Sequence, residues 1–338
     1  MRRPTGCVVI VAHNRPDYLE RAVRSALNQD ISRSRYDVIV SKNFSIETQD
    51  QWLSDSGVRV LLNDSPLWGA MADKAIRGVA GDVILFLDDD DEFDSHKLGR
   101  VLGWFETYPS LGYVHNAMRW IDDAGCLLPV RELRQPLTPI VLRPPKPQDL
   151  SRLRGVNADM NNSCISISRR MYDNCAGNLP KLAANCDEFL FYCALTSGLD
   201  FVADSAALTS YRVHASTSRA RGSFGAYMER KRLQSEGYFE SFRMMTEASR
   251  GTPFEKAAIA SAAFASAEFS IATGWKARPG FSGKDLLSIL SGSDLRSLLY
   301  RFPAGLLAFA SRLAPVQMAK VYYRFRDTPA TMRVASRL

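Results

Sequence analysis

The sequence predicts an α/β fold, with a mixed, mostly parallel sheet flanked by helices and a helical extension at the C-terminus. Two segments of strand length, Cys7–Ala12 and Val83–Leu87, are wholly apolar, as in strands buried on both faces of a parallel sheet. Segments with apolar residues at helical spacing alternate with such strands, which is typical of right-handed strand–helix–strand units. From Phe224 onward the spacing is helical. We therefore expect a Rossmann-like sheet followed by helices.

The first strand leads directly into a helix. After Cys7–Ala12 come His13–Arg15 and then Pro16, which suits a first helical turn, and Asp17, which suits the positive end of a helix dipole. Such a junction is suited to anions and nucleotides. The other expected elements are strands at Tyr36–Val40, Val58–Leu62, Tyr113–Ile121, Asn161–Ser168, Phe201–Ala203 and Ala207–His214, and helices at Gly69–Val79, Ser95–Tyr108 and from Cys186.

The composition is that of an ordinary globular protein. A chain of 338 residues can bury a core large enough for one domain and an appendage, and nothing in the composition indicates disorder or a fibre. The formal net charge is +7, and from Arg296 to Arg337 the only acidic residue is Asp327. This basic end predicts an anionic partner, either a membrane surface or a nucleic acid.

Cysteine use and hydropathy favour a cytoplasmic protein. The six cysteines form no CxxC pair and lack zinc-ligand spacing, which suits core packing in a reducing compartment. The N-terminus lacks the apolar stretch of a signal peptide. The most apolar C-terminal segment, Leu298–Val316, is interrupted by arginines and prolines. We therefore expect no transmembrane helix.

An acidic run follows one of the two apolar strands. Asp88–Asp91 and Glu92 come directly after Val83–Leu87. Carboxylates this close repel one another by about 1 kcal/mol per pair at 4 Å in water, and by more where water is excluded. An acidic run is often only a solvated surface, but ligands of open α/β sheets bind outside the carboxyl ends of the strands. Mg²⁺ or Mn²⁺ would relieve the repulsion and takes oxygen ligands, so we expect a metal site for a phosphorylated substrate.

Two common nucleotide-binding signatures are absent from the sequence. No GxGxxG follows the first strand, and no Walker lysine loop occurs. Both absences argue against a dinucleotide-dependent dehydrogenase and a P-loop NTPase.

Three motifs occur in order along the chain. They are Val8–Pro16 (VVIVAHNRP), Val83–Asp91 (VILFLDDDD) and Tyr211–His214 (YRVH). Together they resemble the family 2 glycosyltransferases of the GT-A fold, in spacing as well as in content, over about the first two thirds of the chain. The resemblance implies an inverting, metal-assisted transfer of a sugar from a nucleotide-diphosphate donor to a hydroxyl of a glycan or lipid-linked acceptor.

The resemblance also implies roles for the aspartates. The DxD motif of the family follows the strand directly and so falls on Asp88 and Asp90, with Asp89 between them. In that pattern Asp90 binds the Mn²⁺ or Mg²⁺ that bridges the donor phosphates, while Asp88 and Asp89 hold ribose and sugar hydroxyls. The register Asp89–Asp91 is the alternative. A metal on the diphosphate would stabilise the charge that develops on the leaving group.

Further roles fall on later residues. His214, the histidine of the YRxH motif, is implied as another ligand of the metal or the diphosphate, and alternation puts it on the same strand face as Arg212. Asp187 matches the acidic pair at the start of the acceptor-side helix of the family and would be the general base. Cys186 replaces the first acid of that pair, so Glu188 is the alternative base. Both acids also suit simple compensation of the helix dipole.

The nucleotide pocket departs most from the family. The residues implied there, besides the aspartates, are Ala12, His13, Asn14, Arg15, Asn43 and Lys74. The flat ring of His13 can stack on a base, and Asn43 can form paired amide hydrogen bonds to a base edge. Because Asn43 stands where the family commonly has a uracil-binding aspartate, guanine and thymine nucleotides stay open beside uracil. Lys74 suits either a phosphate contact or a solvated helix surface.

We expect a transferase domain at residues 1–223, with nucleotide-sugar binding in 1–115 and acceptor binding in 116–223, and a basic helical region at 224–338. Within that region, Leu286–Arg326 predicts either an amphipathic surface on anionic lipid, at the inner face of a membrane, or a helical cap or dimer surface. No nucleic-acid motif appears. The alternative functions are another Mg-dependent nucleotidyl- or phosphotransferase, and a non-enzymatic basic module that binds membrane or RNA.

Overall fold

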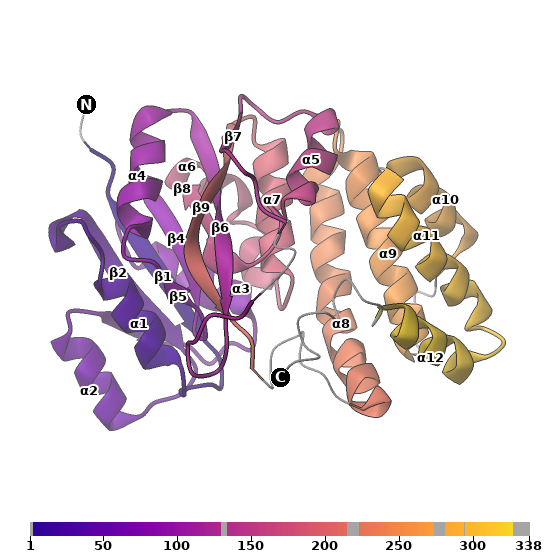
Figure 1. Cartoon of the computed structure of the whole chain (residues 1–338), viewed down its shortest axis with the longest axis horizontal. Coiled ribbons are helices and arrows are strands. Elements are labelled where there is room, and N and C mark those ends of the chain that lie inside the picture. Colours follow the sequence, from indigo (N-terminus) through magenta and orange to yellow (C-terminus); the bar gives the residue numbers. More distant parts are fainter. Residues whose placement is uncertain (1–2, 130–133, 215–222, 274–280, 294, 327–338) are drawn as a thin grey trace. The chain divides into compact units, whose positions relative to one another are not determined.

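A computed structural model describes residues 3–129, 134–214, 223–273, 281–293 and 295–326. The chain forms two compact units (Figure 1). Unit 1 comprises Met1–Leu128 and Leu133–Arg212, and unit 2 comprises Pro129–Glu132 and Val213–Leu338. The functional division into residues 1–115, 116–223 and 224–338 stays a prediction.

Unit 1 contains a mixed sheet with strand order β3-β2-β1-β4-β8-β6-β9-β5, and β7 pairs with β9. The strands are β1 (Gly6–Ala12), β2 (Tyr36–Lys42), β3 (Arg59–Leu62), β4 (Val83–Asp88), β5 (Glu92–Phe93), β6 (Leu111–Ile121), β7 (Ile140–Leu142), β8 (Ile165–Ser168) and β9 (Asp200–Arg212). β3, β2, β1 and β4 are parallel, and so are β6 and β9, whereas β8 is antiparallel to β4 and β6. The predicted mixed, mostly parallel sheet is confirmed.

β4 lies in the interior of the sheet and is buried on both faces. Leu85 and Leu87 belong to a core cluster with residues of α1 (Leu19–Leu27) and α4 (Lys97–Thr107). Phe86 faces the other side, where its ring lies 5.7 Å from Trp68, the first residue of α3 (Trp68–Arg77). Burial on both faces explains why the strand is wholly apolar up to the point where it reaches the edge of the sheet.

The remaining helices of unit 1 are α2 (Glu47–Asp55), α5 (Leu150–Gly155), α6 (Arg169–Cys175) and α7 (Cys186–Thr196). α6 contacts α3 through Tyr172, whose hydroxyl donates to Asp73 at 2.5 Å. α7 packs on the sheet through Phe191, whose ring lies 5.9 Å from Phe201 of β9. α3, α6 and α7 are therefore held together on the face opposite α1 and α4.

The structure corrects two strand predictions. The expected strands Phe201–Ala203 and Ala207–His214 are one strand, β9, because the acid between them is neutralised: Asp204 is buried and accepts hydrogen bonds from Arg100 at 2.6 and 2.8 Å and from Trp104 at 2.7 Å. The expected strand Asn161–Ser168 begins only at Ile165. A 3₁₀ turn over Asn162–Cys164 precedes it, because Asn161 has a φ of +68°.

Unit 2 is helical, as predicted. Its helices are α8 (Phe224–Ser249), α9 (Glu255–Thr273), α10 (Gly283–Gly292), α11 (Leu295–Ala310) and α12 (Pro315–Arg326). The small side chains of α9, among them Ala263 and Ala267, let the neighbouring helices approach closely and pack with Phe281 and Tyr322 in one cluster. α11 continues through Pro303.

Two further features bear on the expected compartment. All six cysteines are free thiols, and Cys126 alone among them is exposed. In the part of the chain that the structure describes, no helix combines the length and hydropathy needed to cross a membrane.

Gly69 in the first turn of α3 makes a close contact that tests this packing. Its amide donates to the Leu182 carbonyl at 2.9 Å, and a Cβ at this position would lie 1.8 Å from the carbonyl oxygen of Leu179. We expect Gly69→Ala to lower the free energy of unfolding by about 1–3 kcal/mol, because backbone must move to admit the methyl group.

Gly103→Ala in α4 is the matched control for urea denaturation. No described residue outside the helix comes within 4 Å of its Cβ position. This variant is expected to gain up to about 1 kcal/mol, because alanine favours a helix over glycine. Equal effects of the two substitutions would show that α3 is not packed as described.

Candidate active site

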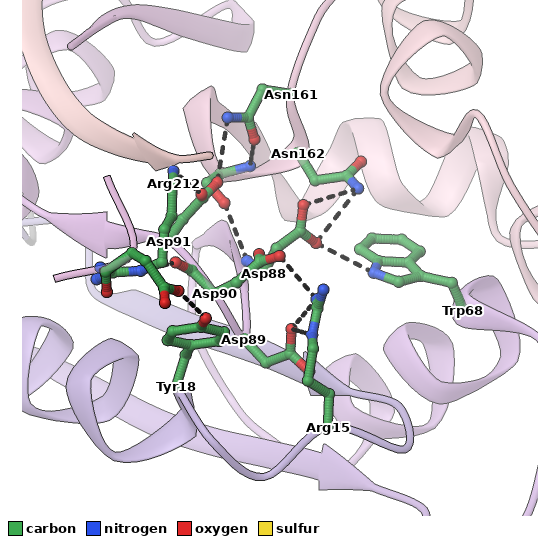
Figure 2. A network of polar contacts seen from close by, with 12 residues as sticks. Arg15, Tyr18, Trp68, Asp88, Asp89, Asp90, Asp91, Asn161, Asn162 and Arg212 are labelled. Atoms are coloured by element: carbon green, nitrogen blue, oxygen red, sulfur yellow. Dashed lines mark hydrogen bonds and ion pairs between the residues drawn. The ribbon is translucent and has the colours of Figure 1, made fainter. Parts of the chain in front are cut away.

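The four aspartates form a tight turn at the carboxyl edge of the sheet (Figure 2). The backbone amide of Asp91 donates to the Asp88 carbonyl at 3.2 Å, and the chain then enters β5, where Glu92 pairs with Ser210 of β9. We call Asp88–Asp91 the acidic turn. Since β4 lies between β1 and β8 in the sheet, groups from several strand ends surround it.

The carboxylate of Asp88 receives hydrogen bonds from two side chains. Trp68 Nε1 donates to Oδ1 at 3.3 Å, and Asn162 Nδ2 lies 3.4 Å from both carboxylate oxygens (Figure 2). The backbone amide of Asp88 donates to Ser163 Oγ at 3.0 Å. Although Asp88 is partly exposed as a residue, these groups enclose its carboxyl. Trp68 thus directs its indole N–H at the first aspartate of the turn.

Arg15 supplies positive charge to the next two aspartates. Its guanidinium forms an ion pair with Asp89, and its Nη2 lies 2.8 Å from Oδ2 of Asp90 (Figure 2). Asp89 is buried, and its Oδ2 has no hydrogen-bond partner among the described residues. Burial raises the pKa of Asp89 to about 6, although Arg15 opposes the shift. The acidic turn therefore keeps a charge that one arginine does not fully balance.

Arg212, the arginine of the YRxH motif, holds the backbone of the acidic turn. It is fully buried. Its amide donates to Asp91 Oδ1, and its Nε donates to the Asp90 carbonyl, both at 2.9 Å. Its remaining guanidinium nitrogens bind the carbonyls of Asp122 and Asp123 and the carboxylate of Glu92. Such a buried guanidinium fixes the position of the aspartates through several charge-assisted bonds.

Burial and like charges raise the pKa of most of these carboxyls. The pKa of Asp88 lies well above its usual range because of burial and then of Asp91, Asp90 and Asp89. The pKa of Asp91 is also raised, mainly by burial. A further positive charge at this edge would stabilise the ionised aspartates.

The donor atoms of the acidic turn fit a hard divalent cation. Carboxylate oxygens are the ligands that Mg²⁺ and Mn²⁺ prefer. Within the described ranges, no three His, Cys, Asp or Glu side chains are arranged to enclose a metal by themselves. Mg²⁺ commonly binds one or two carboxylates together with substrate phosphates, so the acidic turn fits a site that a diphosphate completes.

The residues expected around the nucleotide meet at the ends of β1 and β2. Ala12 pairs in register with Lys42. Asn14, with φ +56°, donates from its amide to Asn43 Oδ1 at 2.7 Å, and Asn43 Nδ2 donates back to Asn14 Oδ1 at 2.8 Å. His13 is exposed beside this pair. The two asparagines therefore fix the loop that carries His13.

Lys74 and His214 were also expected at the donor site. Lys74 lies on α3 and donates to the Leu62 carbonyl, at the end of edge strand β3, at 3.3 Å. His214 is buried and belongs to unit 2. The phosphate contact of Lys74 and the ligand role of His214 stay predictions.

The two candidate bases at the start of α7 have different surroundings. Asp187 accepts a hydrogen bond from the Asn161 amide at 2.9 Å, and burial raises its pKa to about 6. Glu188 is engaged by Arg154 at 3.3 Å and by Asn185 at 3.2 Å. Glu188 is thus paired with an arginine, whereas Asp187 is held by backbone amides, and the choice of base between them stays a prediction.

Sequence patterns did not single out several supports of the acidic turn. Lys97 is fully buried and donates to the Ser163 carbonyl and to Thr209 Oγ1, and burial lowers its pKa to about 7. A lysine in a helix carries no signal of this role. Asn161 and Asn162 had one available signal, since asparagine tolerates positive φ and suits turns before a strand.

Asp88→Asn tests the repulsion within the acidic turn. A carboxyl with a raised pKa in the folded protein destabilises it only as pH rises through the unfolded and then the folded pKa. In metal-free buffer at pH 7.5 we expect the variant to be more stable than wild type, by about 1.4 kcal/mol per pKa unit removed. Near pH 3 the two proteins should be equally stable.

A flip of the Asn162 side-chain amide would turn its Oδ1, which is buried without a hydrogen-bond partner among the described residues, toward the new amide as an acceptor. Urea denaturation at both pH values measures the effect. A variant less stable than wild type at pH 7.5 would mean that repulsion at Asp88 is not significant.

Comparisons with known proteins agree with this architecture. The family described as glycosyl transferase family 2 matches residues 7–175, which is half of the chain. An uncharacterized glycosyltransferase of Nostoc sp. is 27% identical over a 115-residue match that covers 32% of this chain. The match covers about a third of that relative, 35% of its length.

Solved structures show the same fold. Residues 1–349 of S. aureus TarS, in complex with UDP, superpose with a TM-score of 0.60 at 12% identity, covering 95% of this chain and 92% of that one. The mannosyltransferase PcManGT of Pyrobaculum calidifontis, in complex with GDP-Man and Mn²⁺, gives a TM-score of 0.54 at 14% identity, covering 97% and 89%. The fold is thus GT-A, and with the family match it follows that this chain belongs to glycosyl transferase family 2.

Proposed function

We propose that this protein transfers a sugar from a nucleotide-diphosphate donor to an acceptor hydroxyl, with inversion at the anomeric carbon. The observation that carries the proposal is that one residue, Asn161, bonds both to Asp91 of the acidic turn and to Asp187 of α7. A candidate diphosphate site and a candidate base therefore lie in one site of unit 1. The complexes of TarS with UDP and UDP-GlcNAc, and of PcManGT with GDP-Man and Mn²⁺, support a nucleotide-sugar donor.

On the donor side, Asp90 would hold a divalent cation. A cation bound there supplies positive charge for the leaving diphosphate. Asp88 and Asp89 would orient ribose and sugar hydroxyls, and Arg15 adds charge beside them. His13, on the loop held by Asn14 and Asn43, would stack on the base.

On the acceptor side, Asp187 would accept the proton of the acceptor hydroxyl as its oxygen attacks the anomeric carbon. The bond from that carbon to the diphosphate oxygen breaks in the same displacement, and the nucleoside diphosphate leaves. A single displacement inverts the configuration. The raised pKa of Asp187, about 6, makes it a stronger base than an ordinary aspartate while it stays ionised at neutral pH.

The rival class, a nucleotidyl- or phosphotransferase, would also use the acidic turn but would not need a base at the start of α7. A thermal-shift screen of nucleoside diphosphates with Mn²⁺ distinguishes donor classes, because a bound ligand stabilises the folded state. Slow release of UDP or GDP from the matching nucleotide sugars would then support glycosyl transfer, and cleavage of nucleoside triphosphates alone would support the rival.

We expect Asp187→Asn to lower turnover by about 10²-fold or more while donor binding is kept, because a general base acts in the chemical step.

Asp90→Ala should lose turnover and Mn²⁺-dependent donor binding together. Wild-type turnover should rise with pH through about 6, since Asp187 must be ionised. Nucleoside diphosphate release and calorimetry measure these quantities.

Glu188→Gln is the control for Asp187→Asn and should retain most of the turnover. If Asp187→Asn keeps near-normal turnover while Glu188→Gln loses it, Glu188 is the base.

We also propose that α10, α11 and α12 bind an anionic membrane surface, which would suit a lipid-linked acceptor. Leu299, Leu306 and Leu313 recur every seven residues in and just after α11 and are 72%, 48% and 92% exposed. Within α11, Leu299 and Leu306 lie opposite the buried face with Ala304 and Ala308. Exposed bases accompany them at Lys284, Arg312, Lys320 and Arg324. Apolar and basic side chains together favour anionic lipid.

Flotation with vesicles tests this surface. We expect wild type to float with vesicles containing phosphatidylserine, less so at high salt, and not with pure phosphatidylcholine. Leu306→Gln combined with Leu313→Gln should reduce flotation several-fold, because both side chains leave water on binding. Leu233→Gln on α8, an exposed leucine elsewhere, is the control. Unchanged flotation with an altered oligomeric state would instead identify a dimer surface.

A further inference from the structure

We propose that Asn161 is a positioning residue that holds the acidic turn and the base Asp187 in one fixed arrangement. This inference rests on the proposed function, because it assigns Asn161 to the geometry of that reaction. It differs from a purely structural role in that one residue controls groups on both the donor and the acceptor side.

Three hydrogen bonds of Asn161 define this link. Its backbone amide donates to Asp187 Oδ2 at 2.9 Å. Its Nδ2 donates to Asp91 Oδ2 at 3.1 Å, a bond that Figure 2 shows. Its Oδ1 accepts a hydrogen bond from the Ser163 amide at 2.8 Å. The main chain of Asn161 thus bonds to Asp187, while its side chain bonds to the acidic turn. A change in the backbone conformation of Asn161 would therefore alter its hydrogen bonds to the carboxylates of both Asp187 and Asp91.

The backbone of Asn161 is in an unusual conformation. Its φ is +68° and its ψ is +111°, a combination that residues with a Cβ rarely adopt. The surrounding bonds maintain it, including a bond from the Cys164 amide to the Asn161 carbonyl at 3.0 Å. Strained backbone of this kind is kept where neighbouring contacts over-determine it, and here those contacts are the two acidic groups and the 3₁₀ turn that begins β8.

The surroundings of Asp187 give the Asn161 amide particular weight. The titratable groups around Asp187 are Glu188 and Cys186 of α7, Asp88 of β4, Tyr113 of β6, and Asp159, which follows α5. Most of them are acids that disfavour a second negative charge. Arg154, the nearby base, pairs with Glu188 and Asp159. The backbone amides of Asn161, Glu188 and Asp187 itself therefore favour ionised Asp187.

Two substitutions separate the main-chain role from the side-chain role. Asn161→Gly tolerates a positive φ and keeps the amide on Asp187, but it loses the bond to Asp91. Asn161→Ala loses the same side-chain bond and also disfavours a positive φ, so the amide is released from Asp187. Turnover should fall in both variants, and further in Asn161→Ala. The acidic limb of its turnover–pH profile should move to higher pH, whereas that of Asn161→Gly should stay at the wild-type position.

A second measurement does not depend on activity. The carboxyl carbon of Asp187 is followed by NMR in protein with ¹³C-labelled aspartate, and its signal is assigned by its absence from Asp187→Asn. Loss of a hydrogen-bond donor to the charged form raises a carboxyl pKa. We expect the midpoint to be higher in Asn161→Ala than in wild type, by roughly half a unit or more. In Asn161→Gly it should be unchanged.

Equal midpoints in all three proteins would overturn the inference, even if the wild type transfers sugar. If the midpoints differ as expected but the wild type releases no nucleoside diphosphate from any nucleotide sugar, the proposed function fails, and control of Asp187 by Asn161 stands. Urea denaturation at pH 7.5 shows whether each variant is folded. Were Asn161→Ala unfolded, a turnover–pH profile of Asn161→Gly displaced from wild type would by itself contradict the assigned main-chain role.

Discussion

Repulsion between carboxylates at the end of a fully buried strand is the constraint on which the rest of unit 1 depends. β4 delivers Asp88–Asp91 to one short turn, and burial raises the pKa of several of these groups. The protein offsets the repulsion with Arg15 on one side and the fully buried Arg212 on the other. Neither arginine removes it, because the turn carries more charge than they balance. That surplus is what makes this edge of the sheet suited to a cation and a diphosphate.

Several energetically unfavourable features, namely buried charge and positive φ, lie near the same turn. Lys97 is buried and donates to the Ser163 carbonyl, and Asn14, Asn161 and Asn185 have positive φ. Apolar side chains from the sheet, α1 and α4 form a core cluster in unit 1, and a buried polar contact away from the turn joins Asp204 to Arg100. Unfavourable local features that gather at one place are expected where groups must be held ready for a ligand. Apolar packing of the helices and the remaining strands offsets the unfavourable free energy of these features.

The two units are stabilised in different ways. In unit 1 the strands pair in a fixed register within one sheet. In unit 2 helices pack against one another, and the small residues of α9 allow their close approach. A buried polar contact also occurs in unit 2, where the hydroxyl of Tyr322 donates to Glu268. The sequence motifs cover about the first two thirds of the chain, while the structural similarity to TarS extends over 95% of it. Fold is therefore retained in the helical region where no motif is recognisable.

From the sequence alone, the period of apolar residues determined the buried strands, the flanking helices and the helical C-terminal region, because burial on one or both faces imposes a repeat that can be read locally. It also predicted the acidic run at a strand end, since adjacent aspartates need no tertiary contact to be recognised. Only the tertiary structure decided that Asp204 lies inside β9, that Arg212 holds the acidic turn and that Asn161 joins Asp91 to Asp187. These contacts join residues about 70 to 120 positions apart, apart from the 26-residue step from Asn161 to Asp187. No local pattern encodes such pairs, because they form only when the strands have taken their order in the sheet.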